Sequence, residues 1–204
     1  MTLTLYTNPQ SRGRTARWML EEVGAPYQTT MLDYGAPMKS AEFLAINPMG
    51  KVPAIVHDGT VVTEVAAICA YLADAFPEAG LAPTGAARGA YYRWLFFTAG
   101  PLEAAWTARS LNIEPSADHA KTVGYGSFDL AVGALEKAVE GRDYIAGDRF
   151  SAADLYVGSN LAFGMMFGII PKLPVFEAYI GRLMQRDAFQ RASALDDAAA
   201  QPAG

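Results

Sequence analysis

Cysteine and histidine are scarce in this sequence of 204 residues, which contains one cysteine, Cys69, and two histidines, His57 and His119. A single cysteine excludes an intramolecular disulfide, a C-x-x-C redox pair and a cysteine-based zinc site. The two histidines are far apart, with no carboxylate or second histidine at metal-ligand spacing. Cys69 falls inside an expected helix, where cysteine behaves as a small hydrophobe, and His57 precedes an expected hairpin turn. We therefore expect neither a metal site nor catalysis by these residues.

The sequence also lacks an excess of positive charge and a long apolar run. Sixteen Lys and Arg against twenty-one Asp and Glu give a net charge of −5, so the chain is a poor ligand for the phosphate backbone of nucleic acids. The longest apolar stretch, residues 161–170, is interrupted by Gly164 and Gly168 and is too short to span a bilayer. The first residues have a strand pattern and lack the features of a signal peptide. We expect a cytoplasmic protein that binds neither nucleic acid nor membrane.

Apolar residues make up 51% of the sequence and charged residues 18%, which is typical of a globular protein. Residues 1–79 alternate β-branched runs with helical periodicity. The patterns predict strands at 3–7, 27–32, 52–57 and 60–63, and helices around 16–23 and 64–75. Asp58-Gly59 is a strong hairpin signal between the last two strands. This order predicts an α/β domain with a mixed four-stranded sheet.

After a linker at 80–85, residues 86–204 show helical periodicity only. The patterns predict helices at 88–111, bent at Pro101, and at 128–139, 151–167 and 174–185. The alanine-rich tail from Asp196 is expected to fray. We expect a second, all-helical domain over 86–204.

Three segments of the first domain contain residue types suited to ligand binding. Ser11 stands at the start of the first helix, next to Arg12, where a serine caps the helix and where the free amides also attract anions. A cis peptide bond between Val52 and Pro53 would turn the Val52 backbone outward to pair with an extended peptide, although a rigid turn is the simpler interpretation. Glu64, in the first turn of the next helix, suits either the helix dipole or a ligand ammonium group. Together they favour a small charged peptide with its reactive group near Ser11.

These features, in this order, resemble the cytosolic glutathione transferases. The resemblance covers essentially the whole chain and includes residues 145–154, which are similar to the family's buried capping element, with Ser151 as N-cap and Asp154 three residues later. It implies an N-terminal thioredoxin-like domain that binds glutathione, a C-terminal helical bundle with an electrophile site, and a homodimer.

The resemblance also implies roles for individual residues. Ser11 falls where serine-type members place the hydroxyl that donates a hydrogen bond to the glutathione sulfur. Val52, followed by cis Pro53, would pair its backbone with the cysteinyl unit, Glu64 would hold the γ-glutamyl end, and Lys51 would lie near the glycine carboxylate.

Two features around these residues leave alternatives open. Val65 stands where many members have a serine that binds the γ-glutamyl carboxylate, and it offers only its backbone N–H for this role. Either glutathione then binds more weakly, or Glu64 and arginine residues do more of the binding. Arg12 and Val65 complete the expected glutathione-binding set. The family's subtypes differ around residues 6–12, so Tyr6 and Arg12 compete with Ser11 as the group that stabilises the thiolate.

The implied reaction is the attack of the glutathione thiolate on a small hydrophobic electrophile. A hydrogen bond from Ser11 and the helix N-terminus together would lower the thiol pKa by roughly one to three units, without a metal or a general base. Trp106 and Arg109 are the expected electrophile-binding residues. Further candidates for an apolar wall are Tyr91, Trp94, Phe97 and Met165, and core packing is the simpler interpretation of each aromatic candidate. A glutathione-dependent peroxidase or isomerase, and a binding protein that has lost turnover, remain alternatives, and the electrophile is left open.

Overall fold

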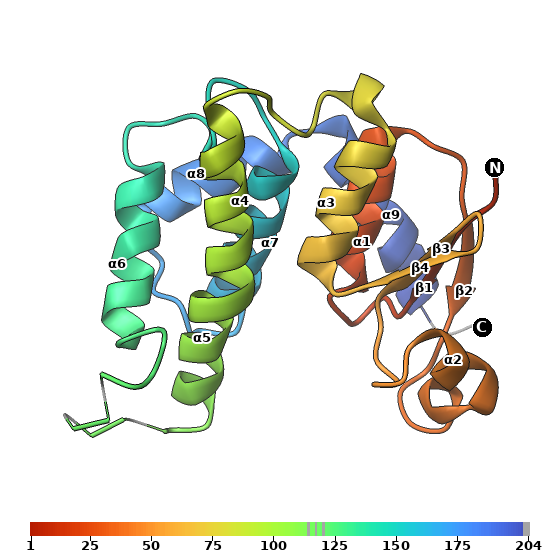
Figure 1. Cartoon of the computed structure of the whole chain (residues 1–204), viewed down its shortest axis with the longest axis horizontal. Coiled ribbons are helices and arrows are strands. Elements are labelled where there is room, and N and C mark those ends of the chain that lie inside the picture. The colour runs from red at the N-terminus through yellow and green to blue at the C-terminus, as the bar shows by residue number, and fades with distance from the viewer. Residues whose placement is uncertain (114, 117, 120, 202–204) are drawn as a thin grey trace. The chain divides into compact units, whose positions relative to one another are not determined.

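The computed structural model describes residues 1–113, 115–116, 118–119 and 121–201 (Figure 1). The chain divides into two compact units. Unit 1 contains Met1–Leu81 and the chain from Gln185 onward, and unit 2 is Ala82–Met184. The division differs from the expected domains of 1–79 and 86–204, because the last helix packs within unit 1.

Unit 1 contains a four-stranded mixed sheet in the order β2-β1-β3-β4. The strands are β1 (Leu3–Thr7), β2 (Gln28–Met31), β3 (Ala54–His57) and β4 (Thr60–Thr63). β1 is parallel to β2 and antiparallel to β3, and β3 and β4 form a hairpin. Asp58 and Gly59 both have positive φ, at 45° and 83°, which is the backbone that makes Asp-Gly a preferred hairpin turn. The predicted mixed sheet is confirmed.

The helices of unit 1 are α1 (Gly13–Val23), α2 (Ala41–Ile46), α3 (Val65–Ala75) and α9 (Asp187–Ala200), with short 3-10 turns η1 (Pro37–Lys39) and η2 (Pro77–Ala79). The predicted apolar stripe of α1 is buried at Ala16, Met19 and Leu20, and α1 packs against β1, α3 and α9. Helix α2 was not predicted, because it has only six residues. Ser40 caps it by accepting a hydrogen bond from the Phe43 N–H.

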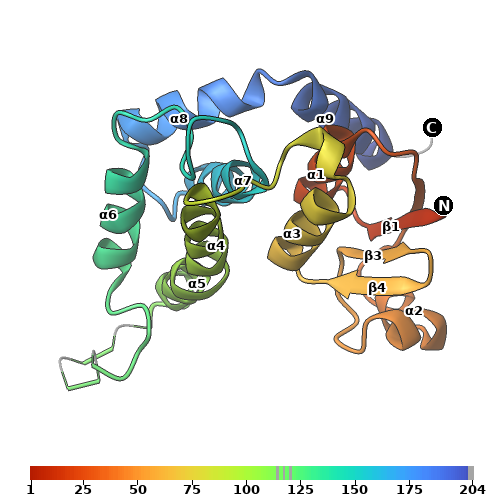
Figure 2. The same ribbon diagram turned by 45° about the horizontal axis from the view of Figure 1, so that its top comes forward.

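The expectation that the chain frays from Asp196 is wrong for the residues described. Helix α9 extends to Ala200 and lies along α1 (Figures 1 and 2). The Trp18 ring of α1 meets Phe189 of α9 edge-on, with ring centroids 5.0 Å apart. Arg17 Nε donates to Asp196 Oδ1 at 2.8 Å, and both side chains are buried. These contacts supply the tertiary stabilisation that alanine-rich helices lack on their own in water.

Unit 2 consists of helices. They are α4 (Ala87–Phe97), α5 (Glu103–Ser110), α6 (Phe128–Val139), α7 (Ala152–Met166) and α8 (Pro174–Met184), with the π-helical turn η3 (Thr98–Leu102) between α4 and α5. Pro101 lies inside η3, because proline cannot donate the backbone hydrogen bond that an α-helix needs. The predicted helix over 88–111 is therefore interrupted at the expected residue. Within the described part of the chain, no helix is both long and apolar enough to cross a membrane.

Helix α7 begins with the predicted capping box of Ser151 and Asp154. The Asp154 carboxylate is fully buried and accepts four hydrogen bonds, from the Ile145 N–H, the Ser151 N–H, the Ser151 hydroxyl and the Tyr179 hydroxyl of α8. Burial raises the pKa of Asp154, and the accepted hydrogen bonds oppose that shift. One side chain thus joins the start of α7 to α8 and to the preceding loop.

Candidate functional site

The register of the sheet brings three separate segments to one edge of unit 1. Tyr6 of β1 pairs with Ala54 of β3, and Ala54 pairs with Thr63 of β4. The chain after β1, the chain before β3 and the chain after β4 therefore meet at this edge. These segments carry the predicted site residues Ser11 and Arg12, Lys51 to Pro53, and Glu64 and Val65.

Ser11 closes a turn between β1 and α1. Its N–H donates to the Asn8 carbonyl at 3.1 Å, and its hydroxyl donates to the same oxygen at 2.7 Å. The Ser11 oxygen also accepts the Gly13 N–H at 2.9 Å. Arg12, not Ser11, holds the N-cap backbone position, so the predicted cap is displaced by one residue although the serine oxygen still satisfies the first amide of α1. The hydroxyl proton rests on the Asn8 carbonyl and must turn away to reach a ligand.

Asn8 holds this turn together and was missed from the sequence. Its side-chain oxygen accepts the Gln10 N–H at 2.9 Å, and its amide donates to the Leu32 carbonyl at 2.9 Å. Tyr34 braces the turn from outside, because its hydroxyl donates to the Gln10 carbonyl at 3.1 Å. Asparagine followed by proline is the preferred start of such a turn. Asn8-Pro9 was therefore a usable signal.

The close approach of α1 to β1 explains the glycine after Arg12. A Cβ atom on Gly13 would collide with the hydroxyl oxygen of Thr7, the last residue of β1, and would come within 2.9 Å of Ser11 Oγ. The Thr7 hydroxyl is buried and has no hydrogen-bond partner among the residues that the structure describes. Gly13 thus lets the helix start lie directly on the end of the strand.

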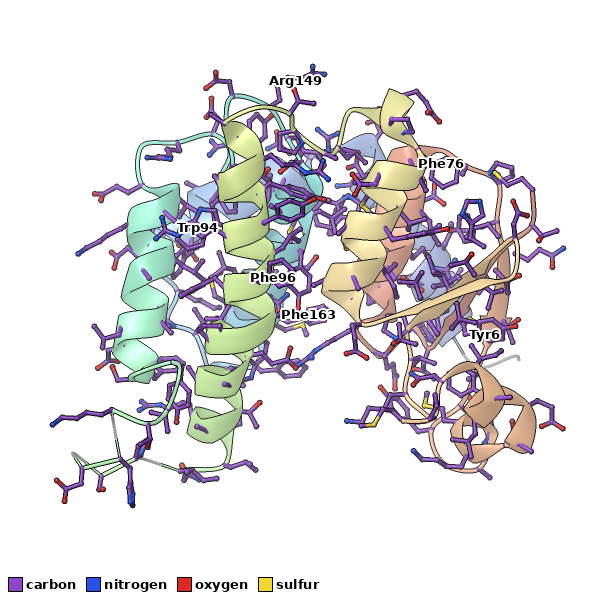
Figure 3. The ribbon with its side chains drawn as sticks, in the orientation of Figure 1. Tyr6, Phe76, Trp94, Phe96, Arg149 and Phe163 are labelled. Carbon is purple, nitrogen blue, oxygen red and sulfur yellow. The ribbon has the colours of Figure 1, made fainter. Side chains whose placement is uncertain are left out.

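Tyr6 is engaged in packing. Its ring lies against Phe43 of α2, with centroids 5.8 Å apart, and it is labelled in Figure 3. Side chains alternate between the two faces of a strand, so Tyr6 points to the face opposite Leu5 and Thr7, which are buried. Arg12 is exposed at the start of α1. Of the three competing groups, Ser11 combines a hydroxyl with direct contact to the helix start.

The peptide bond between Val52 and Pro53 is cis, as the sequence interpretation requires. Val52 is half-buried and packs against the apolar cluster of Met38, Phe43 and Ala54, while Pro53 is buried. This packing fixes the segment at the start of β3.

Two polar side chains shape the turn before Val52, and neither was predicted. Asn47 donates through its amide to the Lys51 carbonyl at 2.7 Å and accepts the Met49 N–H at 3.1 Å. Lys39 Nζ donates to the carbonyls of Met49 and Gly50, at 2.9 and 3.1 Å. The Asn47 contacts are local, within four residues, whereas Lys39 reaches a backbone ten and eleven residues later in the sequence, which local patterns do not reveal. Lys51 itself is exposed.

Glu64 occupies a backbone conformation that is rare for a residue with a side chain. Its φ is +65° and its ψ is 119°, and it is the N-cap residue of α3, with its carbonyl accepting the Ile68 N–H at 2.8 Å. Such backbone strain costs on the order of 1–3 kcal/mol and gathers at functional sites. The Glu64 side chain is exposed, and Val65 follows as the first helical residue, half-buried.

The residues expected to bind an electrophile lie in unit 2. Trp106 and Arg109 are three residues apart on α5, and the Arg109 guanidinium lies 5.3 Å from the centroid of the Phe128 ring. Tyr91 and Trp94 are buried core residues, so the core alternative holds for both. Phe97 and Met165 are half-buried.

Two exposed aromatic residues of unit 2 were missed. Phe96 of α4 is 71% exposed, and Phe167 is 65% exposed. Phe167 stacks on Phe163 of α7 with an interplanar angle of 10°; Phe96 and Phe163 are labelled in Figure 3. A helical pattern identifies the apolar face that packs inward, so aromatic residues outside that face carry no distinct signal.

The structure also places the histidine, cysteine and acidic residues relative to one another. Among residues 1–113, 115–116, 118–119 and 121–201, no three His, Cys, Asp or Glu side chains are grouped to hold a metal ion. Cys69 is fully buried, and burial raises the pKa of its thiol far above the ordinary value.

Comparison with known proteins agrees with the family resemblance that the sequence shows. Residues 1–74 match the family model "Glutathione S-transferase, N-terminal domain", and residues 110–187 match "Glutathione S-transferase, C-terminal domain". The chain is 28% identical over 194 residues to Glutathione S-transferase GST-4.5 of Xanthomonas campestris, covering 89% of this chain and 93% of that protein. It is 31% identical over 170 residues to Glutathione S-transferase 1 of Dianthus caryophyllus, covering 78% of this chain and 77% of the relative.

Among solved structures, a sphingomonad glutathione S-transferase in complex with glutathione is similar to the chain. Its TM-score is 0.77 at 30% identity, and the match covers 95% of this chain and 98% of that structure. The fold that the sequence predicts, a thioredoxin-like domain followed by a helical domain, is confirmed. The chain therefore belongs to the glutathione S-transferase family of enzymes.

Proposed function

We propose that the chain conjugates glutathione, through its thiolate, to small hydrophobic electrophiles, with the Ser11 hydroxyl as the group that stabilises the thiolate. The observation that carries this proposal is the meeting, at one sheet edge, of a hydroxyl at a helix start, a cis Val52-Pro53 segment and the strained Glu64. Each suits a different part of a γ-glutamyl tripeptide.

The binding roles follow from the chemistry of each group. The Glu64 carboxylate pairs with the ammonium of the γ-glutamyl end, and the Val65 N–H meets its carboxylate at the start of α3. The Val52 backbone pairs with the cysteinyl unit. Lys51 and Arg12 supply positive charge for the carboxylates of the tripeptide. Lys39 lies at the Lys51 turn and adds a further cation there.

The Ser11 hydroxyl acts as a hydrogen-bond donor. In the structure its proton points to the Asn8 carbonyl, which also accepts the Ser11 N–H. That carbonyl keeps a partner when the hydroxyl turns to a sulfur, so turning leaves no unsatisfied oxygen. A hydrogen bond to a charged group contributes about 1.5–3 kcal/mol, and each pKa unit requires about 1.4 kcal/mol. The thiolate then attacks the electrophilic carbon and forms a C–S bond. A haloaromatic loses its halide with the bonding electron pair, whereas an epoxide oxygen or an enal takes the electron pair and then a proton from water; no metal takes part in the proposed step.

The electrophile is held by side chains of unit 2. We assign Trp106 to its apolar contact and Arg109 to a polar or cation–π contact, and we add the exposed rings of Phe96 and Phe167, which favour flat, hydrophobic acceptors. From the family resemblance we also propose that the protein acts in the cytoplasm as a homodimer.

The test combines binding with turnover. We expect the protein to be retained on immobilised glutathione, released by free glutathione, and active with at least one acceptor from a screen of haloaromatics, epoxides, enals and hydroperoxides. Turnover confined to hydroperoxides, or isomerisation alone, would support the peroxidase or isomerase alternative. Retention without turnover of any acceptor would support a binding protein, which the loss of a serine at Val65 favours. Absence of retention would overturn the proposal.

Replacing Glu64 with alanine is expected to weaken glutathione binding. The carboxylate and the ligand ammonium form a charge-assisted contact of about 1.5–3 kcal/mol, so the Kd should rise roughly 10- to 150-fold. Isothermal titration calorimetry measures this change. The control is Glu78→Ala, because Glu78 is an exposed glutamate just beyond the other end of α3. An unchanged Kd for Glu64→Ala, or an equal change in Glu78→Ala, would rule out the assigned role.

A further inference from the structure

All three carbonyl groups of the turn that delivers Ser11 accept a hydrogen bond. The Asn8 carbonyl accepts from Ser11, and the Gln10 carbonyl accepts from Tyr34. The Pro9 carbonyl, between them, accepts from Arg14 Nη1 at 3.3 Å. Arg14 is thus the side chain that holds the middle of the turn.

The other terminal nitrogen of the Arg14 guanidinium contacts a residue far away in the sequence. Arg14 Nη2 donates to Asp197 Oδ1 of α9 at 2.6 Å, so one planar guanidinium bridges the turn and the C-terminal helix. Asp197 is held in place by its neighbour, because Asp196 forms the buried ion pair with Arg17. Helix α9 therefore presents a fixed anchor to the turn before α1.

Stability alone does not account for this bridge. The Asp197 side chain is 65% exposed and that of Arg14 is 30% exposed, and an exposed ion pair contributes little to the free energy of unfolding. The bridge instead fixes the orientation of the Arg14 guanidinium. Because Asp197 holds one of its nitrogens, the other nitrogen stays hydrogen-bonded to the Pro9 carbonyl. A hydroxyl that stabilises a thiolate must be held within a few tenths of an ångström of its productive place.

We propose that Arg14 and Asp197 are positioning residues for the Ser11 hydroxyl, through which the C-terminal helix controls thiol ionisation in the glutathione site. The inference rests on the proposed function. Without Asp197, Arg14 loses its hydrogen bond to α9 and keeps only the electrostatic attraction of the buried Asp196, so its contact with the Pro9 carbonyl weakens and the Asn8–Ser11 turn moves more freely.

Charge and positioning predict opposite signs when Asp197 is removed. Asp197 is an anion paired with a cation near the site, so a purely electrostatic effect of Asp197→Ala would favour the thiolate and lower the thiol pKa. Loss of positioning would raise the thiol pKa, because the donor is held less well. The direction of the shift therefore separates the two effects.

The experiment measures the pKa of bound glutathione from the ultraviolet absorbance of its thiolate in wild type and Asp197→Ala. We expect the pKa to rise by about 0.5–1 unit and kcat to fall on the order of tenfold, with KM within about twofold of wild type. Asp197→Asn keeps a side-chain oxygen that can accept a hydrogen bond from Arg14. Its thiol pKa and kcat should therefore stay close to the wild-type values.

The matched control is Arg191→Ala. Arg191 is exposed like Asp197 and likewise joins α9 to α1. Its Nε pairs with Glu21 Oε2 at 3.0 Å, and its side-chain hydrogen bonds go to Glu21 and not to the turn. The Arg191→Ala variant should leave both the thiol pKa and kcat unchanged. A pKa that is unchanged or lower in Asp197→Ala, or an equal rise in Arg191→Ala, would overturn the inference.

Hydrogen exchange of the protein without glutathione provides a second readout. The amides of Gln10, Ser11 and Gly13 are expected to exchange faster in Asp197→Ala and at the wild-type rate in Arg191→Ala. Equal exchange in all three proteins would contradict the positioning role. If the wild-type bound thiol titrates like free glutathione, the proposed function fails, and the exchange measurement still decides whether the bridge orders the turn.

Discussion

Replacing Asp196 with alanine is expected to lower the free energy of unfolding by about 3–5 kcal/mol, because it leaves a buried guanidinium without its counter-ion. The Arg17 side chain is only 5% exposed and that of Asp196 is fully buried, with 2.8 Å between Arg17 Nε and Asp196 Oδ1. Arg17 also donates to the hydroxyls of Tyr27 and Thr29. The loss should appear as a lower denaturation midpoint in urea, with release of α9.

The neighbouring aspartate provides the control. Asp197→Ala removes an exposed ion pair and should cost less than about 1 kcal/mol. The double variant Arg17→Met with Asp196→Leu should recover much of the stability, because removing both buried charges also removes their desolvation penalty. A loss below about 1 kcal/mol in Asp196→Ala would show that α9 does not depend on this pair.

Asp154→Ala is expected to destabilise unit 2 by at least about 3 kcal/mol. The substitution leaves four buried donors without an acceptor, at the junction of α7, α8 and the loop before them. Thermal and chemical denaturation measure the effect. Tyr179→Phe removes one of the four donors and should cost about 1.5 kcal/mol, which keeps the prediction testable if Asp154→Ala does not fold.

The Asp154 carboxylate also makes the free energy of unfolding depend on pH. Burial raises the pKa of Asp154 above its ordinary value of 3.8, so the folded state binds this proton more tightly than the unfolded state. The stabilisation from protonation is then complete below about pH 3.8 and is lost as the pH rises through the folded pKa. The advantage of wild type over Asp154→Asn should therefore decrease as the pH rises above 4.

The exposed Asp148→Ala variant is the control and should leave stability within about 0.5 kcal/mol of wild type. An advantage of wild type that grows with pH in the same range would contradict the raised pKa of Asp154.

Local patterns predicted most of the fold. The β1 and β4 strands, the Asp58-Gly59 hairpin and the interruption at Pro101 all depend on short-range chemistry, and the structure has them where the sequence places them. Helix α9 was missed because its buried residues include alanines and an aspartate, which carry weak or opposite hydrophobic signals. Its order comes from Arg17, which lies 179 residues away.

The sequence indicated the positions of the candidate site residues but not the side chains that support them. Ser11, Val52 and Glu64 lie at the helix and strand ends where the sequence places them, and the bond before Pro53 is cis, while their roles toward a ligand are proposals. Lys39 and Asp197 act on backbone or side chains that only the folded chain brings within reach, so the sequence contains no local sign of them.

Titration of the bound glutathione thiol in wild type and Ser11→Ala decides whether the Ser11 hydroxyl stabilises the thiolate. A free thiol has a pKa of about 8.5 or slightly higher, and we expect a value roughly one to three units lower in wild type. Ser11→Ala should raise it by about one unit or more. Ser127→Ala, which removes the cap hydrogen bond of α6 in unit 2, should leave it unchanged. A wild-type thiol that titrates like free glutathione, or a Ser11→Ala value equal to wild type, would show that Ser11 does not stabilise the thiolate.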